Sequence, residues 1–465
     1  MNRKISVNLA LAIAIIAMTV TFSVTMILSQ NIFDKTVSNV REKEIQYNKI
    51  AEIGKALSKD YYGYDSINQD TLYDMLGAGY MQGIGDADAR YYTAAQYLEY
   101  LSEENGTSMG VGFDVSKAAG EYPKIIRVYT GSPADEAGIV KGYALRRVGD
   151  TDTKNLTLAQ VNTLLKGEQG TSVTLTLADQ GDNVKDPVEL LRRQYDAPTV
   201  FATQREGNTI GYFSIISFNS HTAQELKTAI QTMKESKQGL TGIVLDVRNN
   251  TGGSLDGALD TIDTLCPEGP IGSMLTGDGT QTLLGTSDAG AVGGNLPVVV
   301  LVNENTAAGA ELLASAVRDF HLGSIVGVTT AGKGRVQCDP VRLSDGSAIS
   351  YTVGLLLTSN GENFDGAGIK PDVESVMKSE DARNFYALTV DTDSQIAKAY
   401  EVAQYLMQQM PVYDESTAPD ASQPASAVPS ESTPAETAPA ETAAGETTTA
   451  ADTAATAATT AKPAA

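Results

Sequence analysis

Residues 242–253 read GIVLDVRNNTGG, an apolar run that passes directly into a polar loop ending in two glycines. An apolar run without alternation predicts a strand that is buried on both faces of a largely parallel sheet. Loops at the ends of such strands are where sheets of this kind place binding and catalytic groups. The loop of residues 248–253 is therefore a candidate for part of a functional site.

Around this stretch, apolar strands alternate with amphipathic helices. This alternation predicts an α/β core, which we place at residues 200–378. A second loop at a strand end, NTAAGAE at residues 305–311, precedes the last helix of the pattern. The expected strands are residues 210–215, 242–247, 297–304 and 324–328, and the expected helices are residues 222–236, 255–265 and a segment ending at Phe320.

Residues 105–190 have a different pattern, with short strands, turn residues and a single clear helix. This segment resembles a PDZ domain in its GSPA (131–134), its AGI (137–139) and a glycine-rich loop formed by Met109, Gly110, Val111, Gly112 and Phe113. The resemblance implies that N–H groups of this loop bind the carboxylate at a polypeptide's C-terminus, while the adjacent strand edge pairs with the polypeptide backbone. A small β domain without a ligand is the alternative interpretation.

Four further motifs follow the PDZ-like segment in a fixed order, and together they resemble the C-terminal processing (tail-specific) peptidases over roughly residues 50–378. This resemblance implies an α/β (α+β) peptidase core of the tail-specific protease type with an inserted PDZ β-domain. Family members are typically exported Ser/Lys peptidases whose PDZ domain binds a substrate's C-terminal end and controls access to the active site. The motifs are GIVLDVRNNTGG (242–253), PVVVLVNENTAAGAELLASAVRD (297–319), GVTTAGKGRVQ (327–337) and LSDGSAISYTVGLLLTSNGENFDGAGIKPDVE (343–374).

The resemblance also implies roles for particular residues. A serine hydroxyl becomes an effective nucleophile when a base takes its proton, and a lysine is such a base only in its neutral form. Lys333 matches the family's lysine, and Gln337 matches the glutamine that orients it. Gly252, Gly253 and Gly309 match backbone positions of the oxyanion hole, where N–H groups face the charge of the tetrahedral intermediate.

The nucleophile's own position holds Ala308, three residues before Glu311. Its separation from Lys333 is 333 − 308 = 25 residues, as the family pattern requires, so a shifted register does not explain the missing serine. Thr306 would point away from this position if the turn is helical, and Ser315 would lie about 10 Å further along the helix. Since losing a serine nucleophile costs on the order of 10⁶ in kcat, we expect negligible peptide hydrolysis.

Two interpretations of Ala308 remain open. Gly309 and Ala331 also depart from the family pattern, which favours a natural protein that binds polypeptide C-termini without cleaving them. Such a protein would sequester its ligands or pair with an active relative, and a homodimer is implied by family members that use the N-terminal region for dimer contacts. The alternative is an active Ser/Lys endopeptidase whose native sequence has serine at this position, or which uses another nucleophile.

The N-terminal end predicts a membrane anchor. Arg3 and Lys4 precede an uncharged apolar stretch from Val7 to Leu28, which is long enough to cross a bilayer as one helix. We therefore expect a cytoplasmic stub and a single uncleaved transmembrane helix in residues 1–30, with the bulk of the chain extracytoplasmic.

Three further segments flank the folded units. Residues 41–104 are expected to form an N-terminal helical region, and residues 379–412 a C-terminal helical segment. Residues 413–465 consist largely of Ala, Thr, Pro, Ser and Glu with few large apolar side chains, so we expect a disordered tail.

Composition excludes several classes of ligand. The net charge of −23 and the pI near 4.5 argue against nucleic acid as a partner. Cys266 and Cys338 could form one disulfide, although two separate buried thiols are the simpler expectation. His221 and His321 show no clustered ligand spacing, so we expect neither a metal site nor a cofactor.

Overall fold

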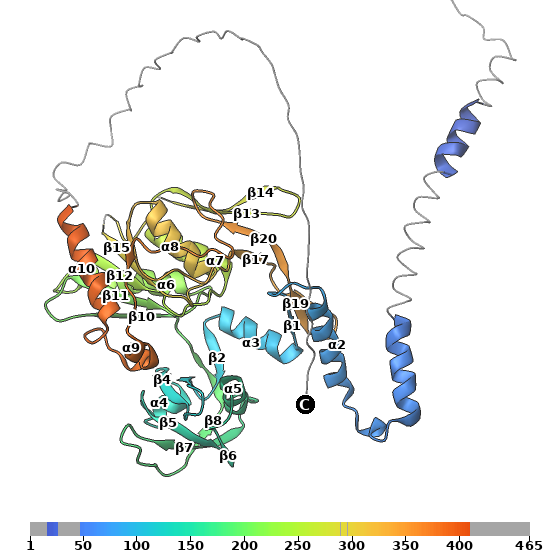
Figure 1. Cartoon of the computed structure of the whole chain (residues 1–465), viewed down its shortest axis with the longest axis horizontal. Coiled ribbons are helices and arrows are strands. Elements are labelled where there is room, and N and C mark those ends of the chain that lie inside the picture. Colours follow the sequence, from blue (N-terminus) through green and yellow to red (C-terminus); the bar gives the residue numbers. More distant parts are fainter. Residues whose placement is uncertain (1–15, 27–46, 289, 295, 410–465) are drawn as a thin grey trace, which may run out of the picture. The chain divides into compact units, whose positions relative to one another are not determined.

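The computed structural model describes residues 16–26, 47–288, 290–294 and 296–409 (Figure 1). The chain divides into two units, Met1–Met410 and Pro411–Ala465, and every described residue belongs to the first. The tail predicted at residues 413–465 therefore lies outside the described residues.

The predicted membrane anchor is described only in part. Residues 16–26 are helical, and the rest of the stretch from Val7 to Leu28 lies outside the described residues. Within the described part of the chain, no helix combines the length and apolarity needed to span a bilayer. The anchor remains a prediction.

The core is a six-stranded sheet with the order β10-β11-β12-β15-β16-β21. The strand β10 pairs antiparallel with β11, and the other neighbours run parallel. Every residue of β12 and β15 is buried, which explains why both read as uninterrupted apolar runs. The predicted α/β core is confirmed. The strands are β10 (Val200–Gln204), β11 (Ile210–Ile215), β12 (Gly242–Asp246), β15 (Val298–Val302), β16 (Gly323–Gly327) and β21 (Val373–Glu374).

Helices cover both faces of this sheet (Figure 1). The helices α6 (Thr222–Glu235), α7 (Leu255–Leu265) and α8 (Gly309–Asp319) pack on one face, and α10 (Ser394–Gln409) packs on the other. Because side chains alternate along a strand, Leu245 joins the cluster beneath the three helices, whereas Val244 joins the cluster beneath α10. The loops after β12 and β15 lead directly into α7 and α8.

A second, antiparallel sheet with the order β14-β13-β20-β17 was not predicted. Its strands are β13 (Gly269–Leu275), β14 (Gln281–Ser287), β20 (Thr352–Leu357) and β17 (Arg335–Gln337). The hairpin of β13 and β14 is rich in Gly, Ser and Thr and is largely unburied, so its apolar periodicity is weak. Pairing with β20 from much later in the chain decides its conformation.

Residues 107–196 form a β-rich unit with a core of its own. One sheet has the order β3-β4-β5-β7-β8, with β6 paired to β5, while β2 pairs with β9. The strand β3 lies at an edge of this sheet. The elements are β2 (Thr107–Gly110), β3 (Phe113–Ser116), β4 (Lys124–Val128), α4 (Pro133–Glu136), β5 (Ala144–Val148), β6 (Thr151–Asp152), α5 (Leu158–Leu165), β7 (Ser172–Ala178), β8 (Val188–Leu191) and β9 (Arg193–Asp196).

The N-terminal region is mostly helical, as predicted, but it contains a strand that the prediction missed. The strand β1 (Arg90–Tyr92) pairs antiparallel with β19 (Ala348–Ser350), which also pairs with β18 (Val341–Arg342). A three-residue strand has no measurable period, so only this distant partner could reveal it. The helical elements are residues 47–60, η1 (Tyr64–Ser66), α2 (Gln69–Gly83) and α3 (Ala94–Glu104).

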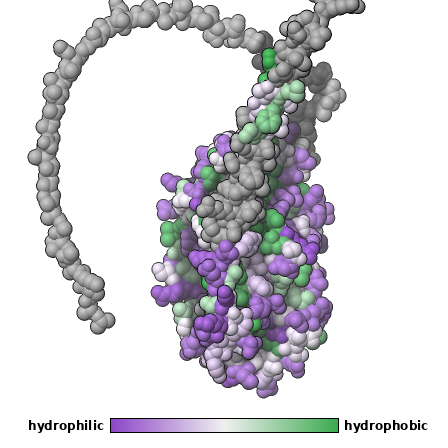
Figure 2. All heavy atoms as spheres, turned by 90° about the vertical axis from the view of Figure 1, so that its right-hand side faces the viewer, coloured by the Kyte–Doolittle hydropathy of each residue, from purple (hydrophilic) through white to green (hydrophobic). Residues whose placement is uncertain are grey.

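The predicted C-terminal helical segment is described to residue 409 and consists of α9 (Ser379–Arg383), η2 (Phe385–Ala387) and α10. On the face of the molecule shown in Figure 2, hydrophilic residues predominate, with smaller hydrophobic groups between them. This is the surface expected for a chain in which 20% of the residues are charged.

Candidate active site

Ala308 occupies a sharp turn between β15 and α8. Its φ of 55° and ψ of −119° are unusual for a residue with a side chain, and it forms the N-cap of α8. Backbone conformations of this kind cost on the order of 1–3 kcal/mol and persist where the surroundings enforce them. The turn therefore presents residue 308 in a fixed orientation, but its side chain is a methyl group without a nucleophilic atom.

The buried carboxylate of Glu311 holds this turn in place. Its Oε2 atom accepts hydrogen bonds from the Ala308 N–H at 2.9 Å and the Lys333 N–H at 2.8 Å. Its Oε1 atom accepts from the Gly332 N–H at 2.7 Å and from the Thr330 hydroxyl. Glu311 has no solvent exposure. One side chain thus joins the turn at residue 308 to the loop that carries the predicted lysine.

The three glycines predicted for the oxyanion hole differ in what their N–H groups do. The Gly252 N–H already donates to Asn250 Oδ1 at 2.8 Å, so an oxyanion would have to compete with this acceptor, and the role of Gly252 stays a prediction. Gly252 also allows close approach, since a Cβ built there would lie 3.0 Å from Ala308 Cβ. The N–H groups of Gly253 and Gly309 donate to no acceptor among the described residues. Both glycines line the same cavity as Ala308 and remain candidate donors.

Lys333 is not arranged as the family pattern implies. Its Nζ atom lies 3.1 Å from Asp88 Oδ1, and the lysine side chain is 32% exposed. The side-chain amide of Gln337 donates to the Arg335 carbonyl oxygen at 3.5 Å and the Thr352 hydroxyl at 3.3 Å. No hydrogen bond joins Gln337 to Lys333 within the described part of the chain, so its predicted orienting role has no contact to support it.

Neither Thr306 nor Ser315 replaces the missing nucleophile. Thr306 is buried, and its hydroxyl donates to the Val247 carbonyl oxygen at 2.9 Å. The Ser315 hydroxyl, also buried, donates to the Leu312 carbonyl oxygen at 2.9 Å. Both hydroxyls therefore donate to carbonyl oxygens within the core.

Ala308, Gly309, Gly252, Lys333 and Gln337 line one cavity of about 1110 Å³. The structure therefore brings the predicted catalytic positions together. Their shared cavity is also rich in carboxylates, which the sequence alone does not reveal because the residues come from distant segments. The carboxylates are Asp88, Glu99, Glu103, Glu104, Asp114, Asp256 and Asp339.

Two of these carboxylates titrate above their ordinary range. Burial raises the pKa of Glu103, and the neighbouring Glu99 adds to the effect. Burial also raises the pKa of Glu104 above its ordinary value of 4.5, with Asp256 and Asp339 contributing and a hydrogen bond with Ser254 opposing. Crowding of negative charge in a partly desolvated cavity explains both shifts.

Replacing Glu104 by glutamine is expected to raise the melting temperature at pH 7. Because the pKa of Glu104 is higher in the folded than in the unfolded state, its protonated form stabilises the fold below the unfolded pKa. This contribution to the free energy of unfolding is lost as the pH rises through the folded-state pKa, so the ionised carboxylate destabilises the fold at pH 7 relative to a neutral side chain. The gain should therefore disappear at or below about pH 4. Melting curves at both pH values test this, with exposed Glu189 of β8 changed to glutamine as the control. A lower melting temperature for E104Q at pH 7 would contradict the assignment.

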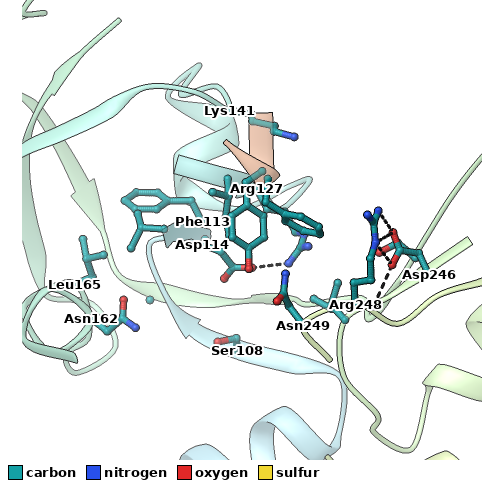
Figure 3. A pocket seen from close by; sticks show the side chains of 18 of the residues that line it. Ser108, Phe113, Asp114, Arg127, Lys141, Asn162, Leu165, Asp246, Arg248 and Asn249 are labelled. Atoms are coloured by element: carbon teal, nitrogen blue, oxygen red, sulfur yellow. Dashed lines mark hydrogen bonds and ion pairs between the residues drawn. The ribbon is translucent and has the colours of Figure 1, made fainter. Parts of the chain in front are cut away.

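The predicted peptide-binding residues line a second cavity of about 770 Å³. In Figure 3, Leu165 and Asn162 of α5 lie on one side of this cavity, and Arg248 lies with Asp246 on the opposite side. All five residues from Met109 to Phe113 contribute to the lining. Both cavities are lined by Asp114, Lys166 and Tyr195, so they adjoin.

Two arginines in this second cavity were not predicted as site residues. Arg127 forms an ion pair with Asp114 at 2.7 Å and lies over the Phe201 ring, with its guanidinium carbon 4.5 Å from the ring centroid. Arg248 is buried between Asp246 and Asp393. The sequence places Arg248 in the loop after β12, but its second partner is far away in the chain.

The remaining sequence predictions concern cysteines and histidines. Cys266 and Cys338 are both free, with Cys266 buried and Cys338 only partly so. His221 is exposed at the start of α6, and His321 follows α8 with a φ of 57°. The residues that the structure describes include no group of three or more His, Cys, Asp or Glu that could hold a metal ion.

Comparisons with known proteins bear on this site. The family described as "Peptidase family S41" matches residues 209–375. A Staphylococcus epidermidis protein assigned as a CtpA-like serine protease is 32% identical over 334 residues, which cover 72% of this chain but only 66% of that protein. A Staphylococcus haemolyticus protein with the same assignment is 30% identical over 367 residues, covering 79% of this chain and 71% of that protein.

A solved structure supports the fold. It belongs to a Bacteroides fragilis protein assigned to the S41 proteases, and it matches with a TM-score of 0.51 and 18% identity. The alignment covers 76% of this chain and 97% of the other. At this identity the likeness supports the fold alone.

Proposed function

The chain belongs to the CtpA-like C-terminal processing proteases of peptidase family S41, but we propose that it binds polypeptide C-termini without cleaving them. Ala308 carries the proposal. It occupies a fixed turn and lines the same cavity as Gly253 and Gly309, at the position where the family motif has the nucleophile. A methyl group cannot attack a peptide carbonyl, and loss of such a nucleophile costs on the order of 10⁶ in kcat.

We assign peptide binding to a PDZ-type domain at residues 105–190. Its strand β3 lies at a sheet edge, where an extended peptide can add as a further strand. Phe113 and Val115 of β3 and Leu165 of α5 line the same cavity, so a peptide placed along β3 would also contact the helix. The loop from Met109 to Phe113 lies at the start of this strand, which suits it to a terminal carboxylate.

We place the protein at a membrane, with a single N-terminal anchor and the bulk of the chain extracytoplasmic. The apolar stretch from Val7 to Leu28 and the preceding Arg3 and Lys4 support this location. Pairing with an active relative would bring bound polypeptides to a functional catalytic site, and a homodimer is the other assembly that we propose. Nucleic acid is not proposed as a ligand because the chain carries a net charge of −23.

A second candidate function is active Ser/Lys endopeptidase activity from a native sequence with serine at position 308, or from another nucleophile. One observation favours it. The turn at Ala308 has an unusual backbone conformation and is held by hydrogen bonds to Glu311, although an alanine side chain needs no fixed orientation for catalysis. The names of the staphylococcal relatives also fit an active protease.

Binding of fluorescent peptides tests the proposed ligand. We expect peptides with a free C-terminal carboxylate to bind at least about tenfold more tightly than the same peptides with a C-terminal amide, a difference of about 1.4 kcal/mol. Fluorescence anisotropy with the full chain measures both affinities. Equal affinities for acid and amide would sink the assignment of C-terminal recognition.

The loop is tested by Gly112→Ala. A Cβ at Gly112, where φ is 89°, would lie 2.0 Å from Ser132 Cβ, so the loop must shift. Gly120→Ala is the matched control because its φ of 75° is similar but a Cβ there meets nothing within 4 Å. We expect G112A to lose acid-specific binding and G120A to retain it at comparable melting temperatures. Unchanged binding by G112A would exclude the loop from the binding site.

A further inference from the structure

We propose that residues 376–389, which we name the connector, form a lid that closes over a peptide bound in the PDZ-type cavity and slows its release. This inference rests on the proposed function and concerns the same cavity. The connector follows β21, contains α9 and η2, and leads toward α10. The lid would therefore supply ligand contacts from outside the PDZ-type domain.

The connector forms part of the wall of the cavity that contains the glycine-rich loop. The cavity of about 770 Å³ falls within the range of about 300–1,000 Å³ that is usual for ligand sites. Phe113 and Val115 of β3, the strand along which the peptide is placed, line it as well. A peptide that fills this cavity would thus contact both β3 and the connector. The connector side chains that line the cavity are Phe385, Tyr386, Leu388 and Thr389.

Tyr386 lies close to charged residues of the PDZ-type domain. Partial burial raises the pKa of its hydroxyl above the ordinary value of 10.0, while Arg127 of β4 opposes this shift and Asp114 of β3 adds to it. In the view of Figure 3, Arg127 and Asp114 lie between Phe113 and Arg248. The Tyr386 side chain is 37% exposed. A peptide in the cavity could therefore cover an aromatic ring that the protein itself leaves partly uncovered.

The connector is loosely attached to the rest of the chain. Its hydrogen bonds stay within residues 378–393, and among the described residues no hydrogen bond or ion pair joins it to any other segment. No residue of the connector is buried. Segments with few buried contacts open locally at a low free energy, and active-site and binding-site lids are drawn from such segments.

The ends of the connector, by contrast, are held in place. Before it, the Ser375 N–H donates to the Gly327 carbonyl oxygen of β16 at 2.8 Å. After it, buried Asp393 forms an ion pair with Arg248 at 2.9 Å. Phe385 contacts the core through the same arginine, whose guanidinium lies over its ring. Two held ends around a weakly attached span allow the connector to move without disturbing the core.

Closure on a bound peptide would bury apolar surface of both partners. Aromatic side chains are frequently the interface residues whose truncation costs most affinity. Differences in affinity among variants of one interface lie mostly in the dissociation rate. The loop from Met109 to Phe113 would then select a polypeptide terminus, and the connector would determine how long that terminus stays bound.

The first experiment measures the release of a fluorescent peptide with a free C-terminal carboxylate from the full chain. Stopped-flow anisotropy follows release into excess unlabelled peptide. We expect Tyr386→Ala to speed release about tenfold and to change the association rate less. Tyr386→Phe should keep the slow release because it retains the ring. Tyr405→Ala is the matched control, since Tyr405 of α10 is 60% exposed and is not among the residues that line this cavity.

The second experiment detects closure by limited trypsin digestion of the full chain, with and without a peptide that lacks Lys and Arg. Lys378 and Arg383 are exposed on the connector. With the peptide at about ten times its Kd, cleavage after both residues should slow about tenfold, because the peptide depletes the open form. Cleavage after Lys237, exposed between α6 and β12, is the control and should not change.

A release rate that Y386A leaves unchanged would overturn the lid, and so would cleavage after Lys378 and Arg383 that the peptide does not slow. Leu388→Ala is a second connector variant with the same expected result, and melting temperatures identify any variant that disturbs folding. Either negative result leaves the proposed function intact as long as acid peptides still bind more tightly than amides. Equal binding of acid and amide peptides would overturn the proposed function and the lid with it.

Discussion

An Arg248→Met variant is expected to lose about 3–5 kcal/mol of unfolding free energy. The side chains of Arg248, Asp246 and Asp393 are only 2%, 5% and 3% exposed. Burial alone would lower the pKa of Arg248, but the carboxylates of Asp246 and Asp393 outweigh it and raise that pKa. Removing the guanidinium leaves two buried carboxylates without their cation, and such charges are costly to bury unpaired.

Loss of the Arg248 guanidinium should also disturb the loop after β12, which is part of the candidate site. Arg248 precedes Asn249 and the glycines of the loop after β12, and it donates to Gln395 of α10 at 2.8 Å. It also lies over Phe385, with its guanidinium carbon 4.8 Å from the ring centroid. The single side chain therefore ties this loop to the C-terminal helical segment.

Equilibrium urea unfolding measures the loss in R248M. The matched control is Arg193→Met, because Arg193 forms an ion pair with Glu136 in which the side chains are 39% and 64% exposed. Exposed pairs of this kind contribute about 0–1 kcal/mol. A loss in R248M no larger than that in R193M would show that the buried cluster is not the stabilising element described above.

A Glu311→Gln variant is expected to lose about 2–4 kcal/mol and to loosen both loops of the candidate site. Four donors share the two oxygens of Glu311: the N–H groups of Ala308, Gly332 and Lys333, and the Thr330 hydroxyl. Glutamine supplies one acceptor oxygen and places an N–H₂ group against the other donors. Buried donors left without acceptors account for the cost.

Hydrogen exchange resolves the effect by residue. In E311Q, exchange of the Ala308, Gly332 and Lys333 amides should accelerate more than exchange in the buried strand β12. Glu362→Gln is the control, because the Glu362 side chain is 64% exposed and its ion pair with Arg318 lies at the surface. Uniform acceleration across the core, or none at residues 308 and 333, would contradict the role assigned to Glu311.

Local sequence patterns were sufficient for the strands of the core, and the family resemblance was needed for the missing nucleophile at residue 308. The strands β12 and β15 are buried along their whole length, so their apolar runs carried an unambiguous signal. Ala308 was located through the resemblance to the C-terminal processing peptidases, whose motif has the nucleophile three residues before the glutamate that matches Glu311.

Contacts between distant segments could not be predicted in the same way. The Lys333–Asp88 ion pair and the Arg248–Asp393 pair each join residues from separate elements, and no periodicity marks them. Likewise, β1 is a strand only because β19 lies beside it. The use of the Gly252 N–H by Asn250 depends on loop geometry rather than on residue type.

The fate of a bound peptide shows directly whether this chain binds polypeptide C-termini without cleaving them. The full chain is incubated with peptides that bind through a free C-terminal carboxylate, and the recovered peptides are analysed by intact mass at increasing times. We expect all peptides to be recovered intact, because Ala308 offers no nucleophile. Fragments that accumulate with time, and that disappear when a Gly112→Ala chain replaces the unchanged one, would contradict it.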